Sequence, residues 1–264
     1  MLSIVSTPIG NLKDITLRAI ETLKSAHLIL AEDTRKSRIL LNALDIHTKM
    51  ISFHQHNEKA REDEVISRLK ESEQIALISD AGTPGISDPG NRLIQRCRKE
   101  GIKMEVIPGP CAFVAALSLF GLDPPYQFVG FLDNMKEKEW VELLFYQGHS
   151  ICYESPHHLM KTLECFLKRA PHKTLYLARE LTKQYEETLE GLPEELLAHF
   201  QKGKILGEFV MIIPGFENPF EKDPEALIKE LQEVFGVAPK EALVAAAKLL
   251  NRPKKELYDL VHRS

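Results

Sequence analysis

The sequence contains few cysteines and no long apolar run, and each of these absences excludes a class of protein. Its 4 cysteines lie far apart in apolar segments. This favours buried thiols in a reducing compartment over a disulfide framework or a zinc site. No apolar stretch approaches the roughly 18 residues that a membrane-spanning helix needs. The short apolar start is typical of a strand and not of a signal peptide. We therefore expect a cytoplasmic protein with no membrane partner.

The sequence also lacks an excess of basic residues. With 34 Lys and Arg against 38 Asp and Glu, its formal net charge is -4, so no global positive field attracts nucleic acid. Any contact with RNA must therefore come from local patches. The candidate patches are the basic run that begins at Arg35 and the C-terminal tail with Lys254 and Lys255.

Apolar strand-like segments alternate with amphipathic helical segments through residues 1–121. One helix follows Thr16, whose side chain can cap it. Such alternation predicts a mainly parallel, buried sheet with helices on its faces. The apolar run from Cys111 to Phe120 is predicted to be a buried helix that Gly121 ends.

The remaining residues are predicted to form two further parts. The segment Gly121 to Tyr126 contains two prolines and is the candidate hinge. Residues 122–216 then predict a second α/β lobe. Residues 217–264 predict a proline-containing linker and a helical extension. The expected fold is therefore α/β with two lobes and a small C-terminal helical part.

Three Gly/Pro turns directly follow predicted strands: TPIGN (7–11), SDAGTPG (79–85) and PGPCA (108–112). Open α/β sheets bind ligands at such strand ends, although a single Gly/Pro turn is ordinary loop chemistry. None of the turns contains a basic residue, and the sequence has no G-x-G-x-x-G or phosphate-binding lysine motif. This argues against a nucleoside triphosphate or NADP and favours a ligand without phosphate.

The three turns occur in order with AEDTR (31–35), YESPHHL (153–159), RELTK (179–183) and a late strand GEFVMIIPG. Together these motifs resemble the tetrapyrrole-methylase-like superfamily of S-adenosylmethionine (SAM) methyltransferases. Within it, the sequence is most similar to the bacterial small-subunit ribosomal RNA (cytidine-2'-O-)-methyltransferases. The resemblance implies a homodimer with SAM in a cleft between two α/β lobes and no metal. It also implies that the acceptor is a cytidine ribose in the decoding region of small-subunit ribosomal RNA.

The resemblance also implies which residues bind the methyl donor. SAM carries a sulfonium, a carboxylate, a ribose and an adenine but no phosphate, in agreement with turns that lack basic residues. Cys111 has an alternative role as a small buried residue at a helix start. The implied donor-binding residues are Pro8, Gly10, Asp80, Gly82, Thr83, Pro110, Cys111, Ala112, Tyr153 and Glu154.

The acceptor side is expected in two strand-exit segments, AEDTR and RELTK. A base near the ribose hydroxyl would assist the reaction, and Glu32 or Asp33 is the main candidate. Both carboxylates have an alternative role as helix caps, and the charges of RELTK could form a surface ion-pair cluster. The predicted catalytic residues are Glu32, Asp33, Arg35, Glu180 and Lys183. The predicted RNA-binding residues are Arg35, Asn57, Arg179, Lys254 and Lys255.

Three positions depart from the pattern of the resembled family, and one of them is Gly85, where a larger apolar residue is usual. Asp133 follows the GFL strand end where a proline is common, and His158 stands where arginine is common. Both changes remove positive charge from the presumed RNA side. Two alternatives to RNA methylation stay open at this point. The first is methylation of a tetrapyrrole or other small acceptor, and the second is a non-catalytic ribosome-assembly factor.

Overall fold

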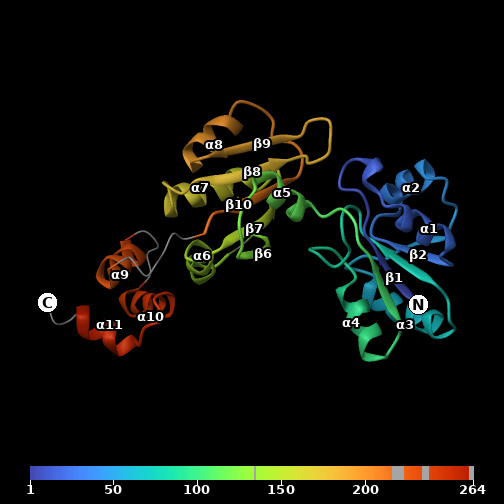
Figure 1. The fold of residues 1–264 in the computed structure, drawn as a ribbon, viewed down its shortest axis with the longest axis horizontal. Helices are drawn as coiled ribbons and strands as arrows, with labels where there is room; N and C mark the ends of the chain where they lie inside the picture. Colours follow the sequence, from blue (N-terminus) through green and yellow to red (C-terminus); the bar gives the residue numbers. More distant parts are fainter. Residues whose placement is uncertain (134, 216–222, 234–237, 262–264) are drawn as a thin grey trace. The chain divides into compact units, whose positions relative to one another are not determined.

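The computed structural model describes residues 1–133, 135–215, 223–233 and 238–261, and the chain divides into two compact units. The first unit consists of Met1–Ala115 and Leu181–Gln184, and the second of Ala116–Glu180 and Tyr185–Ser264. Figure 1 labels the elements of both units. In the described residues, no helix is long and apolar enough to span a membrane.

The first unit is built on a five-stranded parallel sheet with the order β3-β2-β4-β1-β5. The strands are β1 (Leu2–Val5), β2 (Leu28–Ala31), β3 (Met50–Ser52), β4 (Ile75–Ile78) and β5 (Met104–Ile107). The helices are η1 (Leu12–Asp14), α1 (Leu17–Ser25), α2 (Thr34–Ala43), α3 (Glu58–Lys70) and α4 (Asn91–Lys99).

This sheet is covered on both faces, which explains its continuously apolar strands. Every residue of β2 and β4 is buried. Alternate residues point to opposite faces of a strand. Leu30 of β2 therefore belongs to a core cluster with Leu93 of α4, whereas Ile29 belongs to a second cluster with Leu23 of α1. The predicted parallel, buried sheet is confirmed.

The second unit contains a mixed sheet with the order β6-β7-β10-β8-β9. Only β6 and β7 pair in parallel, while β10 runs antiparallel to β7 and β8, and β9 runs antiparallel to β8. The strands are β6 (Tyr126–Phe131), β7 (His149–Glu154), β8 (Leu175–Arg179), β9 (Glu187–Gly191) and β10 (Phe209–Ile213). The helices that flank the sheet are α5 (Ala112–Phe120), α6 (Glu137–Leu144), α7 (Leu159–Arg169) and α8 (Pro193–Phe200). The boundary between the units falls within α5, after Ala115.

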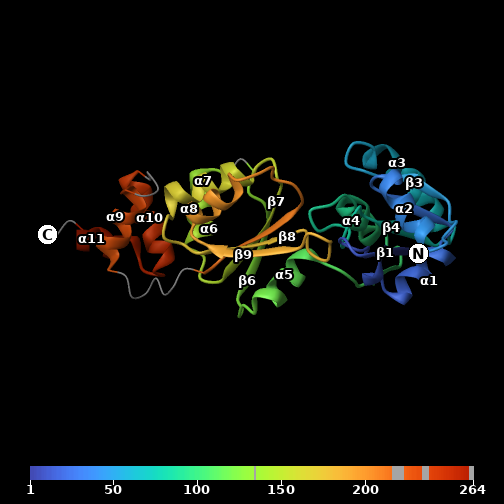
Figure 2. The ribbon, with the colours of Figure 1, turned by 90° about the horizontal axis from the view of Figure 1, so that it is seen from above.

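Helices are unevenly distributed over the two faces of this second sheet. Figure 2 shows α6, α7 and α8 on one face, with α5 on the other. Residues of α7 and α8, such as Leu163 and Leu196, share one hydrophobic cluster with the strands. The helical tail consists of α9 (Pro224–Glu233), α10 (Pro239–Leu249) and α11 (Lys254–Val261). Its residues Leu243 and Leu257 belong to the same cluster.

Several expectations for this fold were wrong or incomplete. The apolar helix α5 was predicted to be buried, but only Ala116 is buried within it. Cys97 and Cys152 are buried thiols as expected, whereas Cys111 and Cys165 are only partly buried.

The sequence pattern also failed to indicate β3, α6 and β9. Strand β3 has only three residues, which is too short for a period-two pattern to be visible. Strand β9 is an edge strand that carries glutamates and buries none of its residues. Helix α6 has charged residues through its first turn. Apolar periodicity indicates burial, so elements with little burial leave a weak signal. The predicted linker falls largely on residues 216–222, which lie outside the described residues.

Candidate functional site

The three Gly/Pro turns lie together at one edge of the first sheet. Strand β1 pairs in parallel with both β4 and β5, so the carboxyl ends of these three strands are neighbours. The turn after β1 then pairs with the turn after β4. Thr7 N donates to the Gly82 carbonyl oxygen at 2.8 Å, and Gly82 N donates to the Thr7 oxygen at 3.1 Å. We call the joined turns the three-loop site.

A chain of hydroxyl groups connects all three turns. Thr83 Oγ1 donates to the Pro110 carbonyl oxygen at 3.3 Å and lies 2.9 Å from Ser6 Oγ. Gly109 permits this approach, because an added Cβ there would lie 3.0 Å from Ser6 Cβ. Gly82 has a φ angle of 78°, which favours glycine. The three turns therefore meet at one edge of the first sheet.

Asp80 joins the AEDTR segment to the three-loop site. It follows β4, and β2 is the parallel neighbour of β4, so the two strand exits are adjacent. Asp80 Oδ1 accepts a hydrogen bond from Asp33 N at 2.9 Å, and Oδ2 pairs with Lys36 Nζ at 2.9 Å. This pairing was absent from the sequence prediction. Lys36 is visible in the sequence only as one of several basic residues.

The two candidate bases of AEDTR differ in electrostatic environment. Burial and the negative charge of Asp80 raise the pKa of Glu32. Hydrogen bonds from the Arg35 guanidinium and the Arg35 backbone N–H hold the pKa of Asp33 well below its usual range. Asp33 also caps α2, because its Oδ1 accepts from Arg35 N at 2.8 Å. The capping role is thus observed for Asp33.

The RELTK segment is divided between the two units. Arg179 lies in the second unit, where its Nε donates to the Leu206 carbonyl oxygen at 2.8 Å and its Nη1 pairs with Glu187 at 3.1 Å. Glu180 is also in the second unit, and its Oε1 accepts from Glu208 N at 2.9 Å. Lys183 belongs to the first unit. The ion pair expected of a surface cluster is therefore present at Arg179.

The other predicted RNA-binding residues occupy different parts of the fold. Asn57 precedes α3, and its side chain does not cap that helix. Its Oδ1 instead accepts from His54 N at 2.8 Å and so closes the turn after β3. Lys254 and Lys255 are exposed in the first turn of α11 in the second unit.

Tyr153 and Glu154 lie at the end of β7 in the second unit. The Tyr153 ring packs edge-on against Phe128, with 4.9 Å between ring centroids. Glu154 is only 2% exposed. Its Oε1 accepts from Ser155 N at 2.8 Å and its Oε2 accepts from Thr162 Oγ1 at 2.6 Å. These neutral donors stabilise the buried carboxylate.

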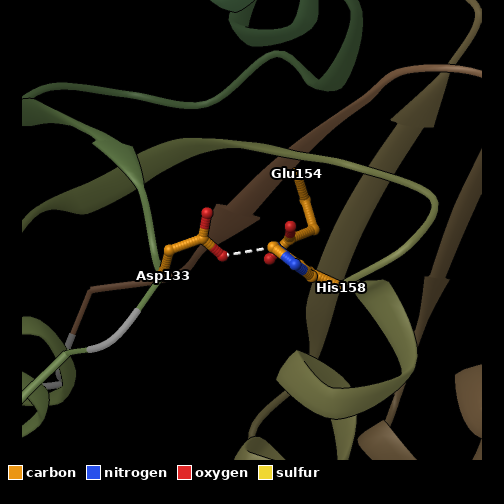
Figure 3. A group of neighbouring side chains, drawn as sticks. All are labelled: Asp133, Glu154 and His158. Carbon is orange, nitrogen blue, oxygen red and sulfur yellow. Dashed lines mark ion pairs between the residues drawn. The ribbon is translucent and has the colours of Figure 1, made fainter.

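Asp133, Glu154 and His158 form a cluster at the carboxyl ends of β6 and β7 (Figure 3). Their possible ligand atoms all lie within 4.8 Å of one another. The Asp133 carboxylate is 2.5 Å from His158 Nδ1, so two of the residues that depart from the family pattern contact each other. A metal ion would have to displace this pair. Among the described residues, this is the group that comes closest to a metal site.

Comparison with known proteins identifies the family of the chain. Residues 1–197 match the profile of the family described as Tetrapyrrole (Corrin/Porphyrin) Methylases. The chain belongs to this family. The resemblance inferred from the ordered motifs is thereby confirmed, and so is the predicted α/β fold of two lobes with a helical C-terminal part.

Individual relatives cover nearly the whole chain. Ribosomal RNA small subunit methyltransferase I of Halalkalibacterium halodurans is 41% identical over 275 residues, which cover 99% of this chain and 94% of that protein. The protein of the same name from Thermotoga maritima is 40% identical over 219 residues, covering 82% of this chain and 99% of its own. A solved diphthine synthase shares the fold, with a TM-score of 0.63 at 15% identity over 81% of this chain and 89% of its own.

The hydroxyl chain of the three-loop site can be tested through stability. Thr83→Val removes the donor to Pro110 and leaves the Ser6 hydroxyl, which is 2% exposed, without this partner. We expect the free energy of unfolding to fall by about 1–3 kcal/mol, measured by urea denaturation. Thr83→Ser keeps the hydroxyl and should lose much less. Equal stability of the Val and Ser variants would contradict the role given to the hydroxyl.

Proposed function

We propose that this family member transfers the methyl group of SAM to a cytidine ribose 2'-hydroxyl of small-subunit ribosomal RNA. The observation that carries the proposal is the three-loop site, in which hydrogen bonds hold three turns without basic residues at one sheet edge. The names of the relatives support ribosomal RNA as the acceptor. Such a substrate implies that the protein works in the cytoplasm.

The residues of the three-loop site fit the chemistry of SAM. Turns rich in Gly and Pro offer backbone N–H and carbonyl groups to a carboxylate and a sulfonium, and Asp80 offers a carboxylate to a ribose. From the first unit, Pro8, Gly82, Thr83, Pro110, Cys111 and Ala112 would bind the donor. Tyr153 and Glu154 belong to the second unit, and their role in donor binding stays a prediction. Lys36 is engaged by Asp80, so the negative charge of Asp80 is partly balanced.

Methyl transfer from SAM is a direct displacement. The ribose oxygen forms a bond to the methyl carbon while the carbon–sulfur bond breaks, and the sulfonium becomes a neutral thioether. The hydroxyl proton must be accepted by a base or by water. Alignment of the three atoms supplies much of the rate increase, and a base adds to it.

Glu32 is better suited to accept this proton than Asp33. A base needs a pKa near the working pH, and the pKa of Glu32 is raised by burial and by Asp80. Asp33 has a lowered pKa, and its carboxylate is committed to Arg35 and to the start of α2. We therefore propose Glu32 as the base and Asp33 as the group that orients the segment.

RNA contacts are proposed at the exposed basic residues. The Arg35 side chain is 89% exposed although it pairs with Asp33, and Lys254 and Lys255 are exposed on α11. Exposed Lys and Arg side chains attract phosphates locally even when the net charge is negative. Arg179 and Asn57 have intramolecular partners, so we give them a supporting role.

The acceptor is tested by a labelling experiment. The protein is incubated with methyl-labelled SAM and with small ribosomal subunits that lack ribose methylation. We expect one labelled cytidine, which ribose-methylation mapping assigns to the 2'-oxygen. Label on a base, on protein or on an added tetrapyrrole would contradict the proposed acceptor. Absence of label despite SAM binding would favour an assembly factor.

The choice of base is tested by two matched variants. Glu32→Gln should lower kcat by about a hundredfold, because the base is lost. Asp33→Asn should lose far less, because Asn is also a good N-cap. In the wild type, activity should fall as the pH drops through the raised pKa of Glu32, since the base must be ionised. Glu32→Gln should lack this dependence. A larger loss in Asp33→Asn would reverse the assignment.

We also propose that the protein is a homodimer. Helix α5 is apolar except for Ser118, yet Val114 is 49% and Leu119 is 50% exposed. Tyr126 and Phe131 on the edge strand β6 are also exposed. Exposed apolar groups of this kind mark protein interfaces.

The dimer is tested by light scattering after gel filtration. The wild type should have twice the chain mass of 30.0 kDa. Leu119→Asp should be monomeric, because a charge in an apolar interface must be desolvated. Leu17→Asp alters a leucine of α1 that is 79% exposed, and it should stay dimeric. A monomeric wild type would refute the proposal.

A further inference from the structure

Gly10 is not required by its own backbone conformation. Its φ angle lies outside the left-handed region that favours glycine. Steric overlap with neighbouring residues excludes a side chain at this position. An added Cβ would collide with Lys183 Cγ, and it would lie 2.8 Å from Thr182 Oγ1 and 3.0 Å from the Leu181 carbonyl oxygen. The missing side chain of Gly10 therefore makes room for the segment Leu181–Gln184, which belongs to the first unit.

The residues that lead to Lys183 adopt costly backbone conformations. Glu180 has a φ angle of 51° and Thr182 has a φ angle of 67°. Positive φ is unusual for any residue other than glycine, and for a β-branched residue such as threonine it is an outlier. Such strain persists only where the surroundings hold the residue in place, and it is concentrated at functional sites.

The contacts of Glu180 hold the first strained residue. Within the second unit, Glu180 N donates to the Glu208 carbonyl oxygen at 2.9 Å. Glu208 N donates to Glu180 Oε1, also at 2.9 Å. An added Cβ on Gly207 would lie 2.7 Å from Glu180 Cδ. Both strained residues thus lie against a glycine, Glu180 against Gly207 and Thr182 against Gly10.

We propose that Gly10 leaves the space into which a positioning segment, Leu181–Gln184, packs. Thr182 in this segment holds Lys183 against the TPIGN turn for methyl transfer. The inference rests on the proposed function. Gly10 and Thr182 are positioning residues, because they act through Lys183. A cation held beside the three-loop site suits an acceptor with anionic phosphates. This role for Gly10 replaces the expectation that Gly10 lines the donor pocket.

The test is Gly10→Ala in the full-length protein. The added methyl group should displace the segment Leu181–Gln184, so its backbone amides should exchange hydrogen faster. The kcat for ribosomal RNA should fall about tenfold or more, because small displacements of positioned groups are costly. The Kd for SAM, measured by calorimetry, should stay within about twofold. Gly203→Ala is the control, since an added Cβ at Gly203 meets nothing within 4 Å.

Weaker SAM binding by Gly10→Ala with unchanged exchange in residues 181–184 would overturn the proposal, because Gly10 would then line the donor pocket. A second variant covers the case in which Gly10→Ala does not fold. Thr182→Gly adopts the same φ angle without strain but is less rigid, so kcat should fall while the Kd for SAM is kept. Unchanged kcat in Thr182→Gly would also overturn the proposal. The exchange and SAM-binding measurements do not depend on which acceptor is methylated.

Discussion

The parallel pairing of β1 with β4 and β5 is the constraint on which the candidate site depends. It brings the exits of the three strands to one edge, so turns that are far apart in sequence can form hydrogen bonds with each other. The bridge between Thr7 and Gly82 and the hydroxyl of Thr83 then connect the turns. Hydrogen bonds between the turns, together with the buried sheet from which they extend, restrict the movement of each turn.

Asp80 connects this rigid edge to the segment that carries the candidate base. The same carboxylate holds the backbone of Asp33, pairs with Lys36 and helps to raise the pKa of Glu32. The charge of Asp80 thus positions the backbone of Asp33 and also raises the pKa of Glu32. In the second unit, neutral donors balance the buried Glu154 carboxylate, and the exposed Asp133 pairs with His158. The carboxylate of Asp80, after β4, is therefore paired with a lysine, whereas the carboxylate of Glu154, at the end of β7, accepts hydrogen bonds from neutral groups.

Much of the first unit could be predicted from the sequence. Its strands are continuously apolar because helices cover both faces, and this pattern is local. The positions of the three turns follow from the strands, and the lack of basic residues in them is visible directly. The helix cap at Thr16 was also predicted, and its side chain accepts from Ala19 N. Edge elements such as β9 were missed, because a strand that buries little has no strong pattern.

The sequence by itself determined the parallel sheet, the three turns and the family, since each depends on local patterns or on motif order. Only the tertiary structure decided how individual residues act. It distinguished Glu32 from Asp33, because a pKa depends on burial and on charges that come from other strands. It left most of α5 only partly buried although its composition is that of a core helix. It also brought Lys183 to Gly10. Contacts between segments remote in sequence have no local signature, so no pattern within either segment could have revealed the contact between Lys183 and Gly10.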